Sequence, residues 1–105
     1  MAHKYHAKPT VVDGIRFASQ KEARRYQELR LLEKAGEVVA LEIQSAFILS
    51  ADGLGGKIGE YRADFTYYDR NGDRVIEDVK GFKTPLYRWK KKHVEAQYGV
   101  QIIEI

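Results

Sequence analysis

The sequence predicts an α/β fold in which a mixed β-sheet is flanked by two helices, with the element order ββ-α-βββ(β)-α-β. Three observations indicate this class. Two stretches begin with a residue that caps helices and end at a glycine, as helices commonly do. The segments around them are rich in branched and aromatic residues or alternate between apolar and polar ones, as strands do. Asp-Gly and Asn-Gly pairs mark tight turns between such segments.

Length and composition predict one small domain behind a short arm. The chain has 105 residues, of which 44% are hydrophobic, so it can bury a core. Residues 1–9 are expected to form a flexible basic arm, and residues 10–105 a single domain. Cysteine is absent, which excludes a disulfide framework and a thiolate metal site. No apolar run approaches the roughly 20 residues of a membrane span, and no signal peptide is recognisable.

The N-terminal part is expected to form a hairpin followed by a helix. Asp13-Gly14 separates two short apolar pieces and favours a β-hairpin. Ser19 is a good N-cap, and Glu22, three residues later, completes a capping-box pattern. We expect the helix to end at Gly36, because glycine readily takes the left-handed conformation that closes helices.

The middle of the chain is expected to form strands. Residues 37–50 are rich in Val, Ile and Leu and predict one or two strands. Residues 60–69 alternate and predict another strand. A two-residue turn at Asn71-Gly72 is expected to join it to a partner strand, residues 73–81.

A second helix and a final strand complete the prediction. Thr84 can cap this helix, with Pro85 at its first position, and Gly99 can end it. Its expected core residues are Leu86, Trp89 and Val94. The apolar residues 100–105 predict the closing strand.

Two acids are candidates for chemistry from their local pattern. Asp78 and Lys80 share one face of their strand with Ile76, because side chains alternate along a strand. Alone, they are consistent with an exposed ion pair worth about 0–1 kcal/mol. Glu22 lies on the stripe that the first helix buries, where a carboxylate needs a partner. The alternative for Glu22 is that it serves only the helix cap.

Strand pairing brings a third acid, Asp64, to the same place. The predicted turn makes paired positions sum to about 143, so Asp64 lies near Val79 and within one residue of Asp78 and Lys80. A one-residue bulge would settle which face each side chain takes. Carboxylates brought together repel, and a hard divalent cation such as Mg²⁺ relieves the repulsion. Such an ion polarises a phosphodiester and activates a water, which Lys80 could position or deprotonate.

These acids belong to an ordered set of motifs that resembles the PD-(D/E)xK nuclease superfamily. The set comprises an acid on a first helix, an Asp on one strand and Asp-x-Lys on the next. The closest resemblance is to a family of short phage-encoded nuclease-like proteins, similar to Holliday junction resolvases. The matching segments are Asp13 to Gly36, Gln44, Tyr61 to Tyr67, Glu77 to Lys91, and Ile102 to Ile105. One departure is Ala63, which stands where the superfamily pattern has proline.

The resemblance implies a restriction-endonuclease-like core and a set of site residues. The implied catalytic residues are Glu22, Gln44, Asp64, Asp78 and Lys80, and the implied metal ligands are Glu22, Asp64 and Asp78. The implied cofactor is Mg²⁺, with Mn²⁺ expected to substitute. Glu77 stands beside Asp78 and leaves open which acid binds the metal, although the face shared with Lys80 favours Asp78.

The region after Lys80 combines basic and aromatic residues and predicts contacts to DNA. The predicted DNA-binding residues are Lys83, Thr84, Tyr87, Arg88, Lys91 and Lys92. On a helix Arg88, Lys91 and Lys92 lie near one another, which favours contact with phosphates. The alternative is a solvated basic helix, and both hold if the aromatic side chains pack while the lysines face phosphate. No P-loop motif is present, so we expect no nucleotide cofactor.

The function that the resemblance implies is a Mg²⁺-dependent DNA endonuclease, which we expect to select branched DNA by its shape. A resolvase makes two symmetric cuts, so a homodimer is expected. One alternative is a non-catalytic DNA-binding module with a nuclease-like fold. Another is a phage nicking or replication-associated nuclease. By resemblance, we expect a phage protein that acts in the cytoplasm of the bacterial host.

Overall fold

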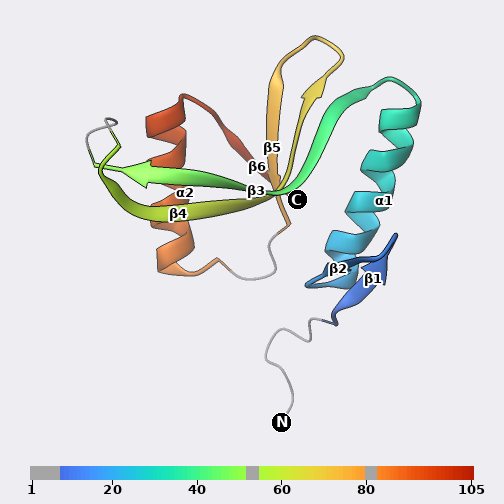
Figure 1. The fold of residues 1–105 in the computed structure, drawn as a ribbon, viewed down its shortest axis with the longest axis horizontal. Helices are drawn as coiled ribbons and strands as arrows, with labels where there is room; N and C mark the ends of the chain where they lie inside the picture. Colours follow the sequence, from blue (N-terminus) through green and yellow to red (C-terminus); the bar gives the residue numbers. More distant parts are fainter. Residues whose placement is uncertain (1–7, 52–54, 80–82) are drawn as a thin grey trace.

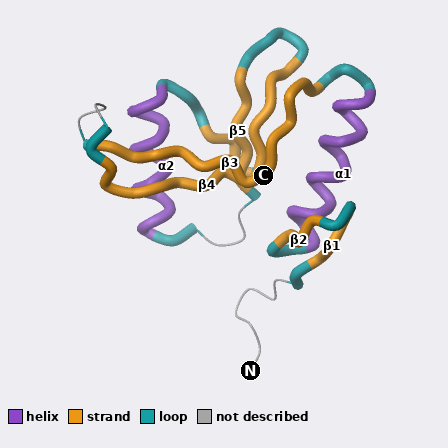
Figure 2. Tube along the Cα trace, viewed as in Figure 1, coloured by secondary structure: helices purple, strands orange, loops and turns teal. Residues whose placement is uncertain are grey.

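The computed structural model describes residues 8–51, 55–79 and 83–105, whose strands form two sheets (Figures 1 and 2). The elements are β1 (Thr10–Val12), β2 (Ile15–Phe17), α1 (Gln20–Lys34), β3 (Val38–Ser50), β4 (Lys57–Asp69), β5 (Arg74–Asp78), α2 (Pro85–Tyr98) and β6 (Ile102–Glu104). Strands β1 and β2 form a hairpin, and the larger sheet has the order β3-β4-β5-β6. Its β5 and β6 run parallel, whereas the other neighbours are antiparallel. The predicted α/β class, with a mixed sheet and two helices, is confirmed for the described residues.

Helix α1 begins where its cap predicts. The Ser19 hydroxyl accepts a hydrogen bond from the backbone N–H of Glu22 at 3.1 Å. The helix ends two residues before Gly36, whose φ of 80° suits the end of a helix. Its buried face carries Tyr26 and Leu29, and it also buries the side chain of Glu22. The predicted helix is confirmed, and one acid of the candidate site lies on its inner face.

The N-terminal hairpin is bound to the side of α1. Asp13 and Gly14 have φ values of 53° and 75°, and positive φ at both positions is what a two-residue hairpin turn requires. The hydroxyl of Tyr26 donates a hydrogen bond of 3.0 Å to the carboxylate of Asp13, and Phe17 packs on the Tyr26 ring with 4.9 Å between ring centroids. The hairpin therefore extends the apolar cluster beneath α1.

Helix α2 also begins at its predicted cap, but its buried face differs from the prediction. The Thr84 hydroxyl accepts a hydrogen bond from the N–H of Tyr87 at 3.0 Å. Tyr87 and Val94, about two helical turns apart, form the buried stripe. Val94 was expected in the core and is fully buried, whereas Leu86 and Trp89 are 60% and 47% exposed. The prediction was wrong for these two, because both positions point away from the buried stripe that Tyr87 and Val94 form. None of the described helices is long and apolar enough to cross a membrane.

The turn between β4 and β5 has three residues rather than the predicted two. Asp69 and Asp73 form the closing backbone pair, with the Asp69 N–H donating to the Asp73 carbonyl at 2.9 Å. Gly72 has a φ of 82°, which is typical of a three-residue turn that ends in a left-handed glycine. Paired positions therefore sum to 142 instead of 143, as Phe65 opposite Glu77 shows. The next pair along the ladder is Asp64 and Asp78, so no bulge is needed to bring them to one face.

The long ribbon of β3 and β4 bends, and its two halves serve two apolar clusters. Ala63 and Phe65 would share a face of a flat strand. Ala63, however, packs in the cluster beneath α2, and Phe65 in the cluster beneath α1. Gln44, in the middle of β3, has a φ of 53° and stands opposite Asp64 in the register. Figure 1 shows that the ribbon of β3 and β4 changes direction along its length. The bend puts Asp64 at the boundary between the two clusters.

Candidate active site

Asp64 of β4 and Asp78 of β5 meet on adjacent strands. Asp78 is fully buried, and Asp64 is partly buried. The carboxylate of Asp64 accepts a hydrogen bond of 2.7 Å from the N–H of Val79, so the predicted proximity to Val79 is confirmed. The carboxyl group of Asp64 also interacts with that of Asp78, and this interaction raises the pKa of Asp64.

The environment of Asp64 favours its protonated form. Burial, followed by the hydrogen bond and the negative charge of Asp78, raises the pKa of Asp64 to about 8. The N–H of Val79 acts in the opposite direction, because it stabilises the carboxylate. The charge of Glu22, on the buried face of α1, adds to the rise. Three acids from α1, β4 and β5 therefore interact electrostatically at one place.

Tyr61 joins this group, although its strand pattern placed it on the opposite face from Asp64. Its buried hydroxyl donates a hydrogen bond to the carboxylate of Asp78. Burial, followed by that hydrogen bond and the charge of Asp78, raises the pKa of Tyr61 well above its ordinary value, so the phenol keeps its proton. No local signal in the sequence identifies Tyr61, because the bend in the ribbon redirects its side chain.

Glu77 points to the other side of the sheet from Asp78. Arg25 of α1 binds it with two hydrogen bonds, of 2.8 Å from Nε and 2.6 Å from Nη2. The hydroxyl of Tyr67 donates a third. Glu77 is thus held in a buried ion pair against α1, which favours Asp78 as the acid of the candidate site.

Of the residues implied by the resemblance, Gln44 stands apart from this cluster. Gln44 is exposed, and its carbonyl accepts a hydrogen bond of 3.3 Å from Arg62. Its place in the register opposite Asp64 and its positive φ make it part of the bend rather than of the buried acid group. Lys80 lies outside the described residues, so its predicted role stays a prediction.

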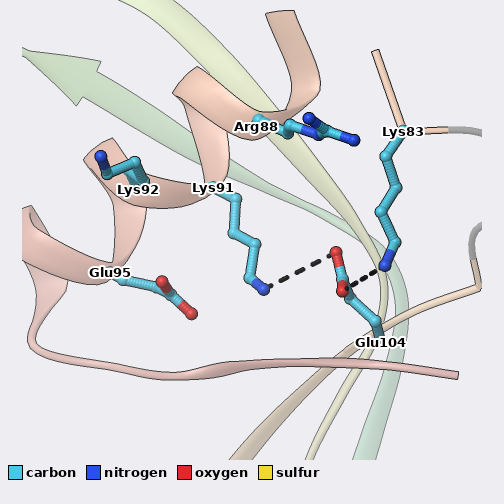
Figure 3. Close-up of a pocket in the computed structure, with 6 residues that line it drawn as sticks. All are labelled: Lys83, Arg88, Lys91, Lys92, Glu95 and Glu104. Atoms are coloured by element: carbon cyan, nitrogen blue, oxygen red, sulfur yellow. Dashed lines mark ion pairs between the residues drawn. The ribbon is translucent and has the colours of Figure 1, made fainter. Parts of the chain in front are cut away.

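A basic pocket of about 410 Å³ lies between α2 and β6 (Figure 3). Its lining residues are Lys83, Arg88, Lys91, Lys92, Glu95 and Glu104. Four of the predicted DNA-binding residues are among them. Thr84 instead serves as the cap of α2, and Tyr87 is buried, so its ring cannot stack on a base.

Glu104 is the central acid of this pocket, and the sequence analysis did not single it out. Its carboxylate lies 2.9 Å from Nζ of Lys83 and 3.6 Å from Nζ of Lys91. The hydroxyl of Tyr87 donates a further hydrogen bond of 2.7 Å. The hydrogen bonds from Lys83 and then Tyr87 lower the pKa of Glu104 to about 2. The one available signal was an acid inside the apolar final strand.

Comparison with known proteins adds a family but no activity. Residues 2–103 match the family described as "Protein of unknown function (DUF1064)". The chain belongs to this family. Neither the curated proteins nor the solved structures contain a significant match to it.

The donor set of this DUF1064 member fits Mg²⁺ in chemistry. Among the described residues, no three acids, histidines or cysteines stand close enough to hold a metal ion as a group. Mg²⁺, however, is usually held by one or two carboxylates and keeps several waters. The adjacent carboxyls of Asp64 and Asp78 meet that requirement, and a cation would replace the proton of Asp64. The negative charge of Glu22 also acts on Asp64.

Proposed function

We propose that the protein is a Mg²⁺-dependent DNA endonuclease with a PD-(D/E)xK nuclease-like core, which hydrolyses phosphodiester bonds. The observation that carries the proposal is the interaction between the partly buried carboxyl of Asp64 and the fully buried carboxyl of Asp78. Two carboxylates brought together repel each other, and a divalent cation bound between them relieves that repulsion. The motif resemblance over nearly the whole chain supports the same conclusion.

The residues would divide the chemistry as follows. Asp64 and Asp78 would hold the metal, and Glu22 would contribute charge or a water-mediated contact from α1. Bound Mg²⁺ supplies a Lewis acid that polarises the phosphodiester and lowers the pKa of water. Tyr61 keeps the Asp78 carboxylate oriented by its hydrogen bond. By resemblance, Lys80 would hold or move the proton of the attacking water.

DNA is the proposed substrate because cationic side chains gather beside the acids. The basic pocket offers Arg88 and Lys92, which have no ion pair with any described residue. The whole chain carries a net charge of +3. Cationic side chains contact phosphates, which carry no base sequence, so we propose recognition of branched DNA by shape and cutting by a homodimer.

The test is cleavage of a labelled four-way DNA junction, compared with a linear duplex and a single flap. Each DNA is incubated with Mg²⁺, Mn²⁺ or EDTA, using the wild type, Asp78→Asn, and Asp73→Asn as an exposed matched control. The proposal predicts paired symmetric cuts in the junction with either metal, retained in Asp73→Asn and abolished in Asp78→Asn and by EDTA.

Each of the other outcomes would change one part of the proposal. Equal metal-dependent cutting of all three DNAs would keep the nuclease and remove the selectivity for junctions. Tight binding without cutting under any divalent metal would replace the nuclease with a DNA-binding module. Full activity in folded Asp78→Asn protein would remove Asp78 from the site.

A further inference from the structure

We propose that the basic pocket is a site for a backbone phosphate of DNA, and that Glu104 is a built-in competitor which occupies its lysines until the phosphate binds. This inference rests on the proposed function, because it takes DNA as the ligand. It adds a regulatory element that the motif resemblance does not contain: an acid that lowers the affinity of the protein for its own substrate.

The geometry of the pocket carries the first step. Lys83, just before α2, and Lys91, on α2, both point toward Glu104 of β6 (Figure 3). A carboxylate presents one negative charge on two oxygens, and a phosphodiester presents the same charge on its two non-bridging oxygens. A phosphate can therefore take over from the carboxylate as the partner of these two lysines.

The remaining charges of the pocket favour that exchange. Four cationic side chains line it, against the acids Glu95 and Glu104. Glu95 is engaged elsewhere, since it accepts a hydrogen bond of 2.9 Å from the N–H of Ile102. Arg88 and Lys92 have no acidic partner among the described residues. The pocket thus has excess positive charge even while Glu104 holds two of its lysines.

Exposure makes the ion pairs of Glu104 easy to break. The side chain of Lys83 is 45% exposed, and those of Lys91 and Glu104 are 26% and 23% exposed. Water screens ion pairs at such positions, so the two lysines can leave Glu104 at small cost. Tyr87 holds the carboxylate from the other side, and Glu104 would therefore stay in place when the lysines turn to a phosphate.

The position of Glu104 connects the pocket to the acid pair. In the parallel pairing of β5 and β6, Glu104 is the register partner of Asp78. The N–H of Ile105 also donates to the carbonyl of Asp78 at 2.9 Å. Neighbouring strands lie about 4.8 Å apart, so a phosphate in the pocket would be close along the backbone to one at the acids. Occupation of the pocket would thus position DNA for the proposed cut.

The experiment measures DNA binding without cleavage. Fluorescence anisotropy with a labelled four-way junction is recorded in EDTA for the wild type, Glu104→Gln and Glu95→Gln. The last is a matched control that removes the same charge from the same pocket but no ion pair. If Glu104 leaves the site open about a tenth of the time, the apparent affinity of the wild type for DNA is about a tenth of the affinity of the open site. Glu104→Gln keeps the site open and should therefore bind roughly tenfold more tightly. Glu95→Gln is expected to change affinity by less than about threefold.

Salt dependence separates competition from a general charge effect. Freed lysines release their own counterions on binding DNA, so the slope of log K against log[salt] should steepen by roughly 1 to 2 in Glu104→Gln. In the Lys83→Ala background, the same substitution should give a smaller gain, because its main partner is already gone. If Glu104→Gln does not fold, Glu104→Asp serves instead, since its shorter side chain reaches the lysines less well and should tighten binding partially.

Two results would overturn the inference, and they differ in meaning. Wild-type protein that binds and cuts DNA, with a folded Glu104→Gln variant that binds no more tightly or keeps the same salt slope, would remove the competitor role alone. Wild-type protein that neither binds nor cuts DNA would remove the proposed function and this inference with it.

Discussion

At the scale of single residues, the charge of Asp64 depends on pH in the neutral range. Its pKa is raised from the ordinary 3.8 to about 8, so between these values the folded protein keeps a proton that the unfolded chain has lost. Unfolding then releases this proton, and the free energy of unfolding of metal-free protein should fall as pH rises from about 4 to about 8.

Metal binding should reverse that trend, because Mg²⁺ replaces the proton. The rise in melting temperature on adding Mg²⁺ should be largest above pH 8 and should shrink toward pH 6. Circular dichroism melts in Mg²⁺ and in EDTA across this range measure it, with Asp64→Asn as the control that should lose the metal effect. A metal effect that does not vary with pH would contradict this account of Asp64.

The hydroxyl of Tyr61 gives a second prediction at the residue scale. Tyr61→Phe removes a donor from the buried carboxylate of Asp78, and hydrogen bonds to charged groups contribute about 1.5–3 kcal/mol. We expect a loss of that size in the free energy of unfolding, measured by urea denaturation, together with slower DNA cleavage. Tyr68→Phe is the control, since Tyr68 lies on the same strand and is 43% exposed. Equal stability of the two variants would rule out the role given to Tyr61.

At the scale of elements, one ion pair ties α1 to β5. Arg25 lies one turn after Glu22 on α1, and Glu77 directly precedes Asp78 on β5. The Arg25–Glu77 ion pair therefore fixes the position of Glu22 relative to Asp78. Arg25→Ala would leave the buried carboxylate of Glu77 with only the Tyr67 hydroxyl, and breaking a buried pair costs about 3–5 kcal/mol. Arg24→Ala, at the exposed neighbouring position, should cost less than about 0.5 kcal/mol.

Thermal and urea unfolding of the two arginine variants measure this difference. A comparable effect of both substitutions would mean that the ion pair contributes little and that α1 is held by apolar packing alone.

The elements that the sequence predicts well are those with local signals. Ser19 and Thr84 cap their helices through hydrogen bonds to the third residue that follows, which depend on a few neighbouring atoms only. Leu86 and Trp89 were assigned to the core incorrectly because the phase of α2 is set by the sheet beneath it, not by the helix sequence. Local chemistry fixes where a helix starts, whereas distant contacts decide which face it buries.

The candidate site likewise contains some residues that local sequence signals predict and others that only distant contacts bring in. Asp64 and Asp78 could be brought together from the turn between their strands, although the turn length was wrong by one residue. Tyr61 could not be found, because it reaches Asp78 only through the bend in the β3–β4 ribbon. Glu104 could not be found either, because it meets the basic residues through the parallel pairing of β6 with β5, which no short segment encodes.

At the scale of the whole molecule, the two apolar clusters share one ribbon and should unfold together. Leu29 is fully buried beneath α1, so Leu29→Ala should cost about 2–5 kcal/mol. Leu31→Ala, at a position 67% exposed on the same helix, should cost less than about 0.5 kcal/mol. Trp89 on α2, the only tryptophan, reports on the other cluster.

Urea unfolding of Leu29→Ala is therefore followed both by Trp89 fluorescence and by far-ultraviolet circular dichroism. A single domain predicts that both transitions shift equally, whereas separate clusters would leave the fluorescence transition in place.

The three-residue turn at 70–72 also bears on how the protein can be labelled. Exposed turns are ordinarily the safest places for an inserted tag or fluorophore-binding peptide. Here one residue more or less would slip β5 by one position against β4 and exchange Glu77 and Asp78 across the sheet. Glu77, which binds Arg25, would then lie on the side of the sheet where Asp78 now lies, and Asp78 would face α1. A protein that tolerated such an insertion in stability assays could still lose the proposed cleavage of DNA.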